Sequence, residues 1–296
     1  MYTTGVLFIA VCLSGAVAVM PGMAAQDVRP PLYKMRTLIG HAIENQQGKD
    51  LGDIEEVIVD AATGDVAYAV VAVGEFLGVG GKLWAIPWHA LQQPLAGDAF
   101  RLAMTEEQLK NAPGFDKDRW PDLEDRHWGD TIHAYYGQPP YWGKHLPPKT
   151  AHDDTVKPVA HRLLRAGQVL QREVMNARGQ RLGDIEELVI DAAAGNVAYA
   201  VLSVGEFLGL GGKLLAIPWP ALQQSAGLGT FRLDIDKEAL QKAPGFDKDH
   251  WPNMADPRWG AEVHSYYGQQ PYWERRRQVE TPRQANPGAP ATGQRQ

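Results

Sequence analysis

The chain has 296 residues, of which 44% are hydrophobic and 22% charged, with a formal net charge of −6 and one cysteine. This length can form one large domain or two of medium size, and the apolar fraction is sufficient for a buried core. The acidic balance excludes the basic surface typical of nucleic-acid-binding proteins, so we expect no nucleic-acid partner.

The first 25 residues have the pattern of a secretory signal peptide. Residues 5–20 are apolar apart from Cys12 and Ser14, and the 22–25 segment supplies small residues for cleavage. An uncleaved membrane anchor is the alternative, although the run is short for a span of about 20 residues. Membrane contact is expected only in that case. Cleavage would remove the one cysteine and leave no disulfide or cysteine-based metal site. We therefore predict export to the bacterial periplasm.

An internal duplication defines the organisation of the chain. Residues 51–88 recur as 182–219 at an offset of 131, with 29 of 38 positions identical. A repeat of this length is a unit of fold. The predicted segments are a signal peptide (1–25), a first repeat (26–143), a linker (144–162), a second repeat (163–274) and a disordered tail (275–296).

Each repeat is predicted to begin with two strands. Leu38, Ile39 and Ile43 are the apolar positions of the first strand, and the second repeat has Val169, Leu170 and Val174 there. In the next strand Ile54 is out of phase with Val57. A β-bulge near Glu55–Glu56 would bring both side chains to one face, because it inserts one extra residue. The same shift recurs at Ile185 and Leu188.

Residues 66–73 are apolar on both faces of the predicted third strand. A small antiparallel sheet normally leaves one face polar, so we expect this strand to be covered. The covering segment could be the other repeat or the aromatic block that follows the last strand.

The remaining strands are short and no long helix lies between them. Residues 82–88 form a strand that ends near Pro87, and 100–102 form the last strand. This pattern predicts a small closed barrel instead of a βαβ unit. A short helix follows, with Thr105 and Gln108 as its capping box and Asp236 as the equivalent N-cap.

Three strings that the two repeats share resemble the PRC-barrel domain family. They are G-D-I-E-E-x-x-x-D at 52–60, V-A-Y-A-V at 66–70 and F-L-G-x-G-G-K-L-x-A-I-P-W at 76–88. The likeness covers residues 34–102 and 165–233. It implies an all-β-dominated fold of two tandem small PRC-type barrels, each followed here by a short helix and an aromatic-rich extension. It also implies a role in protein assembly without a common active site.

Motifs that suggest catalysis or metal binding have simpler explanations. The glycines at 78–81 do not form a phosphate loop, because Phe76 occupies a required glycine position and Leu83 replaces the Ser/Thr. The repeated carboxylates are predicted to lie on solvated strand faces or to cap turns; they are Asp53, Glu55, Glu56 and Asp60, with Asp184, Glu186, Glu187 and Asp191. The aspartates at 116, 118 and 125 are expected to cap turns. His133 and His264 are expected to be structural. We therefore expect no catalytic residue, cofactor or metal.

Two sets of residues are candidates for binding. The first set lies in the glycine-rich loops and consists of Phe76, Leu77, Phe207 and Leu208. These side chains could be buried as core under the barrel, or they could form an apolar contact for a partner. The second set is a possible aromatic ligand surface: Trp128, Tyr135, Trp142, Trp259, Tyr266 and Trp273. Cover for the third strand is the preferred role of the aromatic block, since buried Trp and Tyr can hydrogen-bond at an edge.

The sequence thus favours a non-catalytic protein-binding or scaffolding module of the bacterial envelope. Its two barrels are expected to pack against each other as a pseudo-two-fold pair, and an unidentified protein is expected as partner. The alternative is a binder of small ligands or glycans that uses the Trp/Tyr block.

Overall fold

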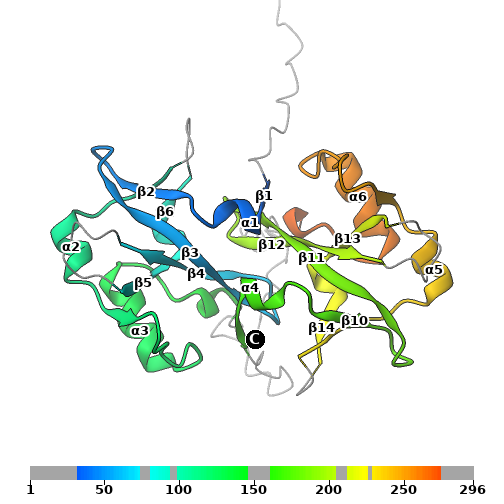
Figure 1. The fold of residues 1–296 in the computed structure, drawn as a ribbon, viewed down its shortest axis with the longest axis horizontal. Helices are drawn as coiled ribbons and strands as arrows, with labels where there is room; N and C mark the ends of the chain where they lie inside the picture. Colours follow the sequence, from blue (N-terminus) through cyan, green and yellow to red (C-terminus); the bar gives the residue numbers. More distant parts are fainter. Residues whose placement is uncertain are drawn as a thin grey trace, which may run out of the picture.

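The computed structural model describes residues 32–73, 81–93, 99–145, 161–204, 212–225 and 229–274. Two curled sheets, one for each repeat, form half-barrels that meet at the centre of the molecule (Figure 1). Among the described residues each sheet contains eight strands, seven of which follow one path. The predicted all-β-dominated architecture of two tandem units is confirmed.

The two sheets have the same strand order. The first runs β6 (Leu91–Gln92), β7 (Phe100–Leu102), β2 (Ala42–Asn45), β3 (Asp50–Asp60), β4 (Val66–Ala72), β5 (Lys82–Pro87) and β8 (Gly114–Asp116). The second runs β14 (Leu222–Gln224), β15 (Phe231–Leu233), β10 (Glu173–Met175), β11 (Arg181–Asp191), β12 (Asn196–Ser203), β13 (Leu214–Pro218) and β16 (Gly245–Phe246). Neighbours are antiparallel except for β2 with β7 and β10 with β15.

The helices are short and lie outside the sheets. They are α1 (Met35–Leu38), α2 (Glu106–Lys110), α3 (Arg126–Tyr135), α4 (Ala166–Val169), α5 (Lys237–Gln241) and α6 (Pro257–Tyr266), with 3-10 turns η2 (Trp88–Ala90), η3 (Tyr141–His145) and η5 (Trp219–Ala221). The predicted capping box of Thr105 and Gln108 is formed. Asp236 occupies the equivalent N-cap position without a side-chain capping bond. Within the described ranges, no helix is long and apolar enough to cross a membrane.

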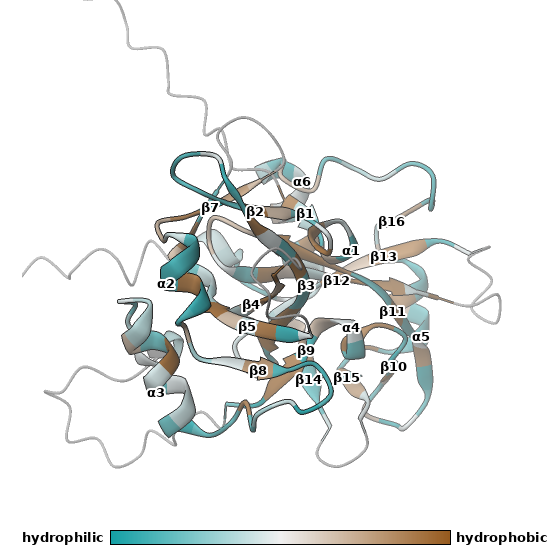
Figure 2. Ribbon diagram, turned by 60° about the vertical axis from the view of Figure 1, so that its left-hand side comes forward, coloured by the Kyte–Doolittle hydropathy of each residue, from teal (hydrophilic) through white to brown (hydrophobic). Residues whose placement is uncertain are grey.

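The hydrophobic residues are concentrated on the central strands, as the colouring of β4 and β12 in Figure 2 shows. Both faces of β4 are buried, as its uninterrupted apolar sequence predicts. The predicted bulge is also confirmed, because the register of β3 against β4 shifts between Ile54 and Glu56. The equivalent shift in β11 lies between Ile185 and Glu187.

The prediction of a first strand through Leu38 and Ile39 is wrong. Leu38 ends the one-turn helix α1, Ile39 is 37% exposed, and only Ile43 lies in a strand, β2. Gly40 has a φ of +82°, so the chain reverses direction between the helix and the strand. The helix α1 lies against β11 of the other repeat, and its buried residues Met35 and Leu38 belong to the main core.

The two repeats exchange their first strands. β1 (Leu32–Lys34) pairs with β11 of the second repeat, and β9 (Leu163–Arg165) pairs with β3 of the first. Figure 1 shows β1 and α4 at the centre, each against the sheet of the other repeat. The main hydrophobic core consequently contains residues of both repeats, such as Leu38, Val59 and Leu188.

Equivalent residues also meet directly between the repeats. Asp65 and Asn196 occupy the same position of the repeat and form an antiparallel bridge with each other. The Val66 N–H donates to the Gly195 carbonyl at 2.9 Å, and the Val197 N–H donates to the Gly64 carbonyl at 2.8 Å. This reciprocity places the axis that relates the repeats between the two hairpin loops.

Candidate functional site

The aromatic block of each repeat covers the outer face of its own third strand. In the first repeat Tyr68 of β4 lies 5.5 Å from Trp128, 5.4 Å from His133 and 6.0 Å from Tyr141, measured between ring centroids. Tyr199 of β12 makes the matching contacts with Trp259, His264 and Tyr272. Of the two covers that the sequence allows, the structure shows the aromatic block in this position.

The six candidate residues of the aromatic ligand surface differ in exposure. Trp142 is 9% exposed and lies against α3, where a Cβ on Gly129 would be 2.7 Å from its ring. Trp273 packs on Gly260 in the same way. Trp128 and Trp259 are half-buried. Tyr135 and Tyr266 are 38% exposed, and their hydroxyls donate to backbone carbonyls of the preceding helix segment. Ligand binding by these residues stays a prediction.

The candidate contact residues of the glycine-rich loops lie outside the described residues. These are Phe76, Leu77, Phe207 and Leu208. Their role as a contact for a partner stays a prediction.

His133 is enclosed by the aromatic block. It is 2% exposed, and the rings of Tyr68, Tyr141 and Trp142 lie within 5.4–6.1 Å of its own. Burial lowers the pKa of His133 to about 4, and the charge of Asp130 only partly opposes this effect. The imidazole is therefore neutral at neutral pH, as suits a structural residue.

The repeated carboxylates divide into exposed and buried groups. Asp53 and Glu55 are exposed as predicted, and Asp60 caps a turn by accepting from the Ala62 N–H at 2.9 Å. The expectation is wrong for Glu56 and Glu187, which are buried. The bulge accounts for this difference, because it turns the residue after Glu55 toward the other repeat.

Glu56 and Glu187 hold the exchanged segments in place. The Glu56 carboxylate accepts from the Gly167 N–H at 3.1 Å and forms an ion pair with Arg165 at 3.3 Å. The Glu187 carboxylate reaches Arg36 in the same way, through the backbone N–H at 3.4 Å and the guanidinium at 3.8 Å. Each repeat thus supplies a carboxylate that binds the first helix of the other repeat through a backbone hydrogen bond and an ion pair.

One acidic residue of each extension caps a helix. The Asp125 side chain accepts from the His127 N–H at 2.9 Å, and Asp256 accepts from the Arg258 N–H at 2.8 Å. No cluster of three metal-ligating side chains occurs in the part of the chain that the structure describes.

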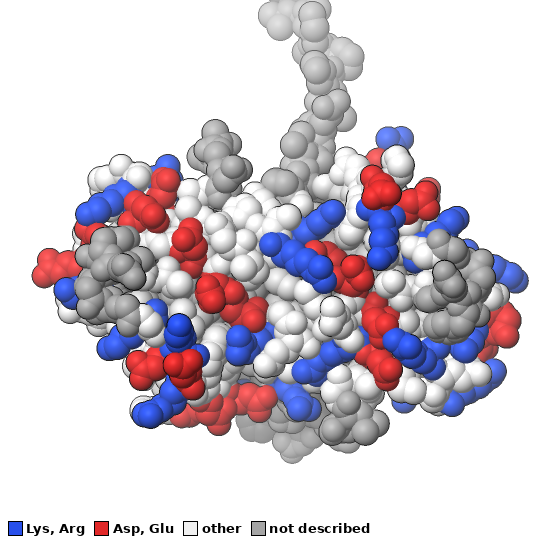
Figure 3. Space-filling model, in the orientation of Figure 1, with Lys and Arg blue, Asp and Glu red and all other residues white. Residues whose placement is uncertain are grey.

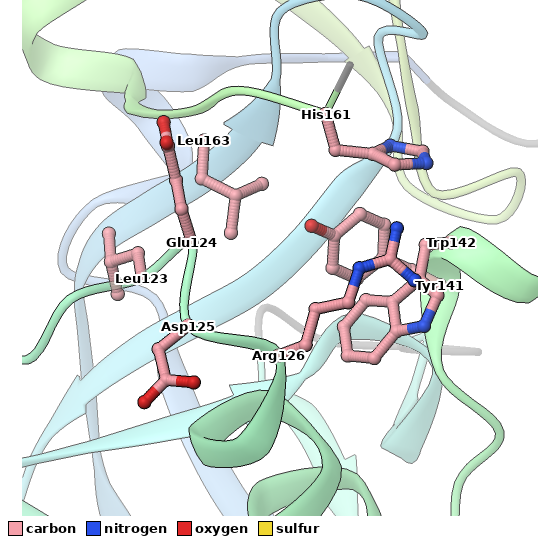
Figure 4. Close-up of a pocket in the computed structure, with 8 residues that line it drawn as sticks. All are labelled: Leu123, Glu124, Asp125, Arg126, Tyr141, Trp142, His161 and Leu163. Atoms are coloured by element: carbon pink, nitrogen blue, oxygen red, sulfur yellow. The ribbon is translucent and has the colours of Figure 1, made fainter. Parts of the chain in front are cut away.

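A pocket of about 160 Å³ opens at the start of α3 in the first repeat (Figure 4). Three separate segments line it: Leu123, Glu124, Asp125 and Arg126 before and in α3, Tyr141 and Trp142 in η3, and His161 and Leu163 at the exchanged strand. No motif in the sequence predicted this site. The one available signal was a difference between the repeats, because Pro257 stands where the first repeat has Arg126.

The polar groups of the pocket are held by its aromatic wall and by a buried carboxylate. The Arg126 guanidinium lies 5.5 Å from the Trp142 ring centroid. The His161 Nδ1 contacts the carboxylate of the fully buried Asp60. Burial and the charge of Asp60 raise the pKa of Tyr141, and Arg126 acts in the opposite direction. The Tyr141 hydroxyl is therefore a neutral hydrogen-bond donor at neutral pH.

Sequence comparison identifies the two barrel segments. The family model of the PRC-barrel domain matches residues 31–109 and again residues 162–240, which together make up more than half of the chain. The chain belongs to the PRC-barrel domain family. A comparison with curated proteins finds no match.

Most of the pocket lies outside the PRC-barrel segments proper. Of its lining residues only Leu163 falls within a matched region, and it belongs to the exchanged strand β9. The pocket is thus formed by the extension that follows the first PRC barrel and by the segment that enters the second.

Proposed function

We propose that this PRC-barrel protein is a non-catalytic protein-binding scaffold of the bacterial envelope. The observation that supports this function is the reciprocal exchange of β1 and β9, which joins the two barrels through backbone hydrogen bonds. A pair of barrels joined in this way presents its surfaces at a fixed separation, and fixed separation is what a scaffold requires.

Charge does not favour a nucleic-acid or a membrane-surface partner. Acidic and basic side chains are interspersed over the face in Figure 3, without a large region of either sign. The predicted contact is apolar and lies in the glycine-rich loops, at Phe76 and Phe207. The signal-like segment at 1–25 supports a location in the periplasm.

The experiment is a cross-linked capture from whole envelopes with the chain from Gln26 onward as bait. Recovered proteins are identified, purified and titrated against three baits: the unaltered chain, the Phe76→Asp/Phe207→Asp variant and the Ile39→Asp variant. Ile39 is exposed and apolar, so it controls for the introduced charge. We expect binding to the unaltered chain and to Ile39→Asp, and at least tenfold weaker binding to the double variant.

Two results would contradict the scaffold. One is recovery of cell-wall material without any protein that binds after purification. The other is a purified partner that binds all three baits equally, which would remove the loops from the interface.

Glycan binding is the second candidate function, and the exposure of Tyr135 and Tyr266 favours it. Exposed Tyr rings can stack on sugar rings, and the two are equivalent positions of the repeat. Calorimetry with soluble peptidoglycan fragments tests it. Heat that saturates, and that the Tyr135→Ala/Tyr266→Ala variant loses, would move the function from scaffolding to glycan binding.

A further inference from the structure

We propose that the pocket beside α3 is a binding site for a small monovalent carboxylate, with Arg126 as its main ligand-binding residue. This inference does not depend on the proposed scaffold function. It rests on the pairing of the charged groups, the size of the pocket and the difference between the two repeats.

Arg126 has a charge that the described protein does not pair. No ion pair or hydrogen bond joins its guanidinium to another residue that the structure describes, and the guanidinium lies over the Trp142 ring, 5.5 Å from the ring centroid. Guanidinium groups bind planar carboxylates through two parallel hydrogen bonds. Stacking on Trp142 leaves the edge of the guanidinium available for such a pair.

Two further groups stand beside the guanidinium. Figure 4 shows Arg126, Tyr141 and His161 gathered on one side of the pocket, and the rings of Tyr141 and His161 meet edge to face at 5.9 Å. No hydrogen bond joins the Tyr141 hydroxyl to a described residue, so it can donate to a ligand oxygen. Asp60 holds the His161 ring in position from behind.

The acidic residues of the site favour a ligand with one negative charge. Asp60 contacts His161, and Glu124 and Asp125 lie at the rim of the pocket. A dianion such as phosphate would be repelled by Glu124 and Asp125 more strongly than a monoanion, because the repulsion between like charges grows with the charge of the ligand. The pocket has a volume of about 160 Å³, which limits the ligand to a small molecule. A carboxylate on a short carbon chain fits this space.

The second repeat keeps the walls of the site but not its charge. Tyr272, Trp273 and Asp256 repeat three of the lining residues, whereas Pro257 replaces Arg126 and Ala255 replaces Glu124. The aromatic residues are retained in both copies because they cover Tyr68 and Tyr199. That structural role does not require an arginine, so it does not account for Arg126.

The test is an NMR titration of the ¹⁵N-labelled chain from Gln26 onward. The probes are acetate, propionate and benzoate, each with its amide as the neutral control, and inorganic phosphate. A second set of titrations uses N-acetyl-alanyl-alanine and its C-terminal amide. This pair shows whether the site binds the C-terminal carboxylate of a protein or only a free small acid. Arg126→Gln and Arg126→Pro are compared with the control Arg258→Gln. This control removes one positive charge from α6, one residue after Pro257, which is the position equivalent to Arg126.

Arg126→Pro is expected to fold, because Pro257 stands at the same first-turn position of α6. We expect saturable shifts around α3 and η3 with at least one carboxylate, at least tenfold weaker binding in both Arg126 variants, and unchanged binding in Arg258→Gln. Weaker binding of phosphate than of that carboxylate is also expected. No saturation with any carboxylate, equal binding of an amide, or unchanged binding in Arg126→Gln would overturn the proposal.

Discussion

The Trp88 ring lies directly over Gly195, in the hairpin loop of the other repeat. A Cβ on Gly195 would be 2.9 Å from Trp88 Cδ1, and one on Gly64 would be 2.5 Å from Trp219 Cδ1. The Trp88 Nε1–H also donates to the Ala192 carbonyl at 2.8 Å. Each PRC barrel thus places a tryptophan on the turn of the other repeat, and this relationship gives the first prediction.

Gly64→Ala should destabilise the protein more than Gly40→Ala. The two glycines have nearly the same positive φ, +81° and +82°, but a Cβ on Gly40 meets nothing within 4 Å. Both substitutions incur a left-handed backbone cost of about 1 kcal/mol. Gly64→Ala additionally displaces Trp219, at about 1–3 kcal/mol. Urea unfolding measures the difference, and equal losses would show that the tryptophan contact contributes nothing.

Glu56→Ala should loosen the exchanged segment. The substitution removes the acceptor of the Gly167 N–H and the ion-pair partner of Arg165, and hydrogen bonds to charged groups contribute about 1.5–3 kcal/mol. Hydrogen exchange should become faster at residues 163–167 in particular. Glu55→Ala, one position earlier and exposed, is the matched control and should leave these rates unchanged. Equal effects of the two variants would contradict the role given to Glu56.

His133 should make the protein less stable in mild acid. Its pKa is about 4 in the folded protein against 6.5 for the free side chain, so the unfolded chain takes up the proton first as the pH falls. Unfolding free energy is then lost between pH 6.5 and 4 and is fully present above pH 6.5. The loss is at most about 3 kcal/mol, since one pKa unit corresponds to about 1.4 kcal/mol.

The measurement is urea unfolding at several pH values for the unaltered chain and for His133→Phe, which keeps an aromatic ring in the site. The slope between pH 6.5 and 4 should become smaller in the variant. His127→Gln removes an exposed histidine six residues earlier and should keep the original slope. A His133→Phe slope identical to that of the unaltered chain would exclude His133 as its source.

Export should leave a mature protein that begins near Gln26. The apolar 5–20 segment and the small residues at 22–25 are the basis for this expectation. Fractionation of producing cells, followed by N-terminal sequencing, would show it in the periplasmic fraction. A chain that retains residues 1–25 and sediments with the membrane would establish the anchor instead.

Features encoded by short stretches of sequence were predictable. The phase shift of Ile54 against Val57 located the bulge, and the pair Thr105 and Gln108 located a helix start. The apolar sequence of β4 showed that something must cover it. In each case neighbouring residues determine the local backbone or the number of buried faces.

Features that depend on distant pairing were not predictable. β1 and β9 have three residues each, too few for a periodic pattern, and their partners lie more than a hundred positions away. The misassigned strand at Leu38 and the unexpected burial of Glu56 both result from this exchange. The pocket could not be predicted for the same reason, because His161 comes close to Arg126 only when β9 pairs with β3.

Cysteine cross-linking tests most directly whether the two barrels are joined by exchanged strands. The chain from Gln26 onward has no cysteine, so introduced pairs report without interference. Val59 faces Leu164 across β3 and β9, whereas pairing within the second repeat would place Leu164 opposite Ile190, the position that Tyr33 occupies here. Opposed residues of antiparallel strands have Cβ atoms about 4.5–5.5 Å apart, close enough for oxidation to join them.

We therefore predict that mild oxidation forms an intramolecular disulfide in the Val59→Cys/Leu164→Cys variant and none in Leu164→Cys/Ile190→Cys. The product should remain a monomer in non-reducing electrophoresis. A disulfide in the second pair, or a covalent dimer from the first, would contradict the exchange within one chain on which the scaffold proposal depends.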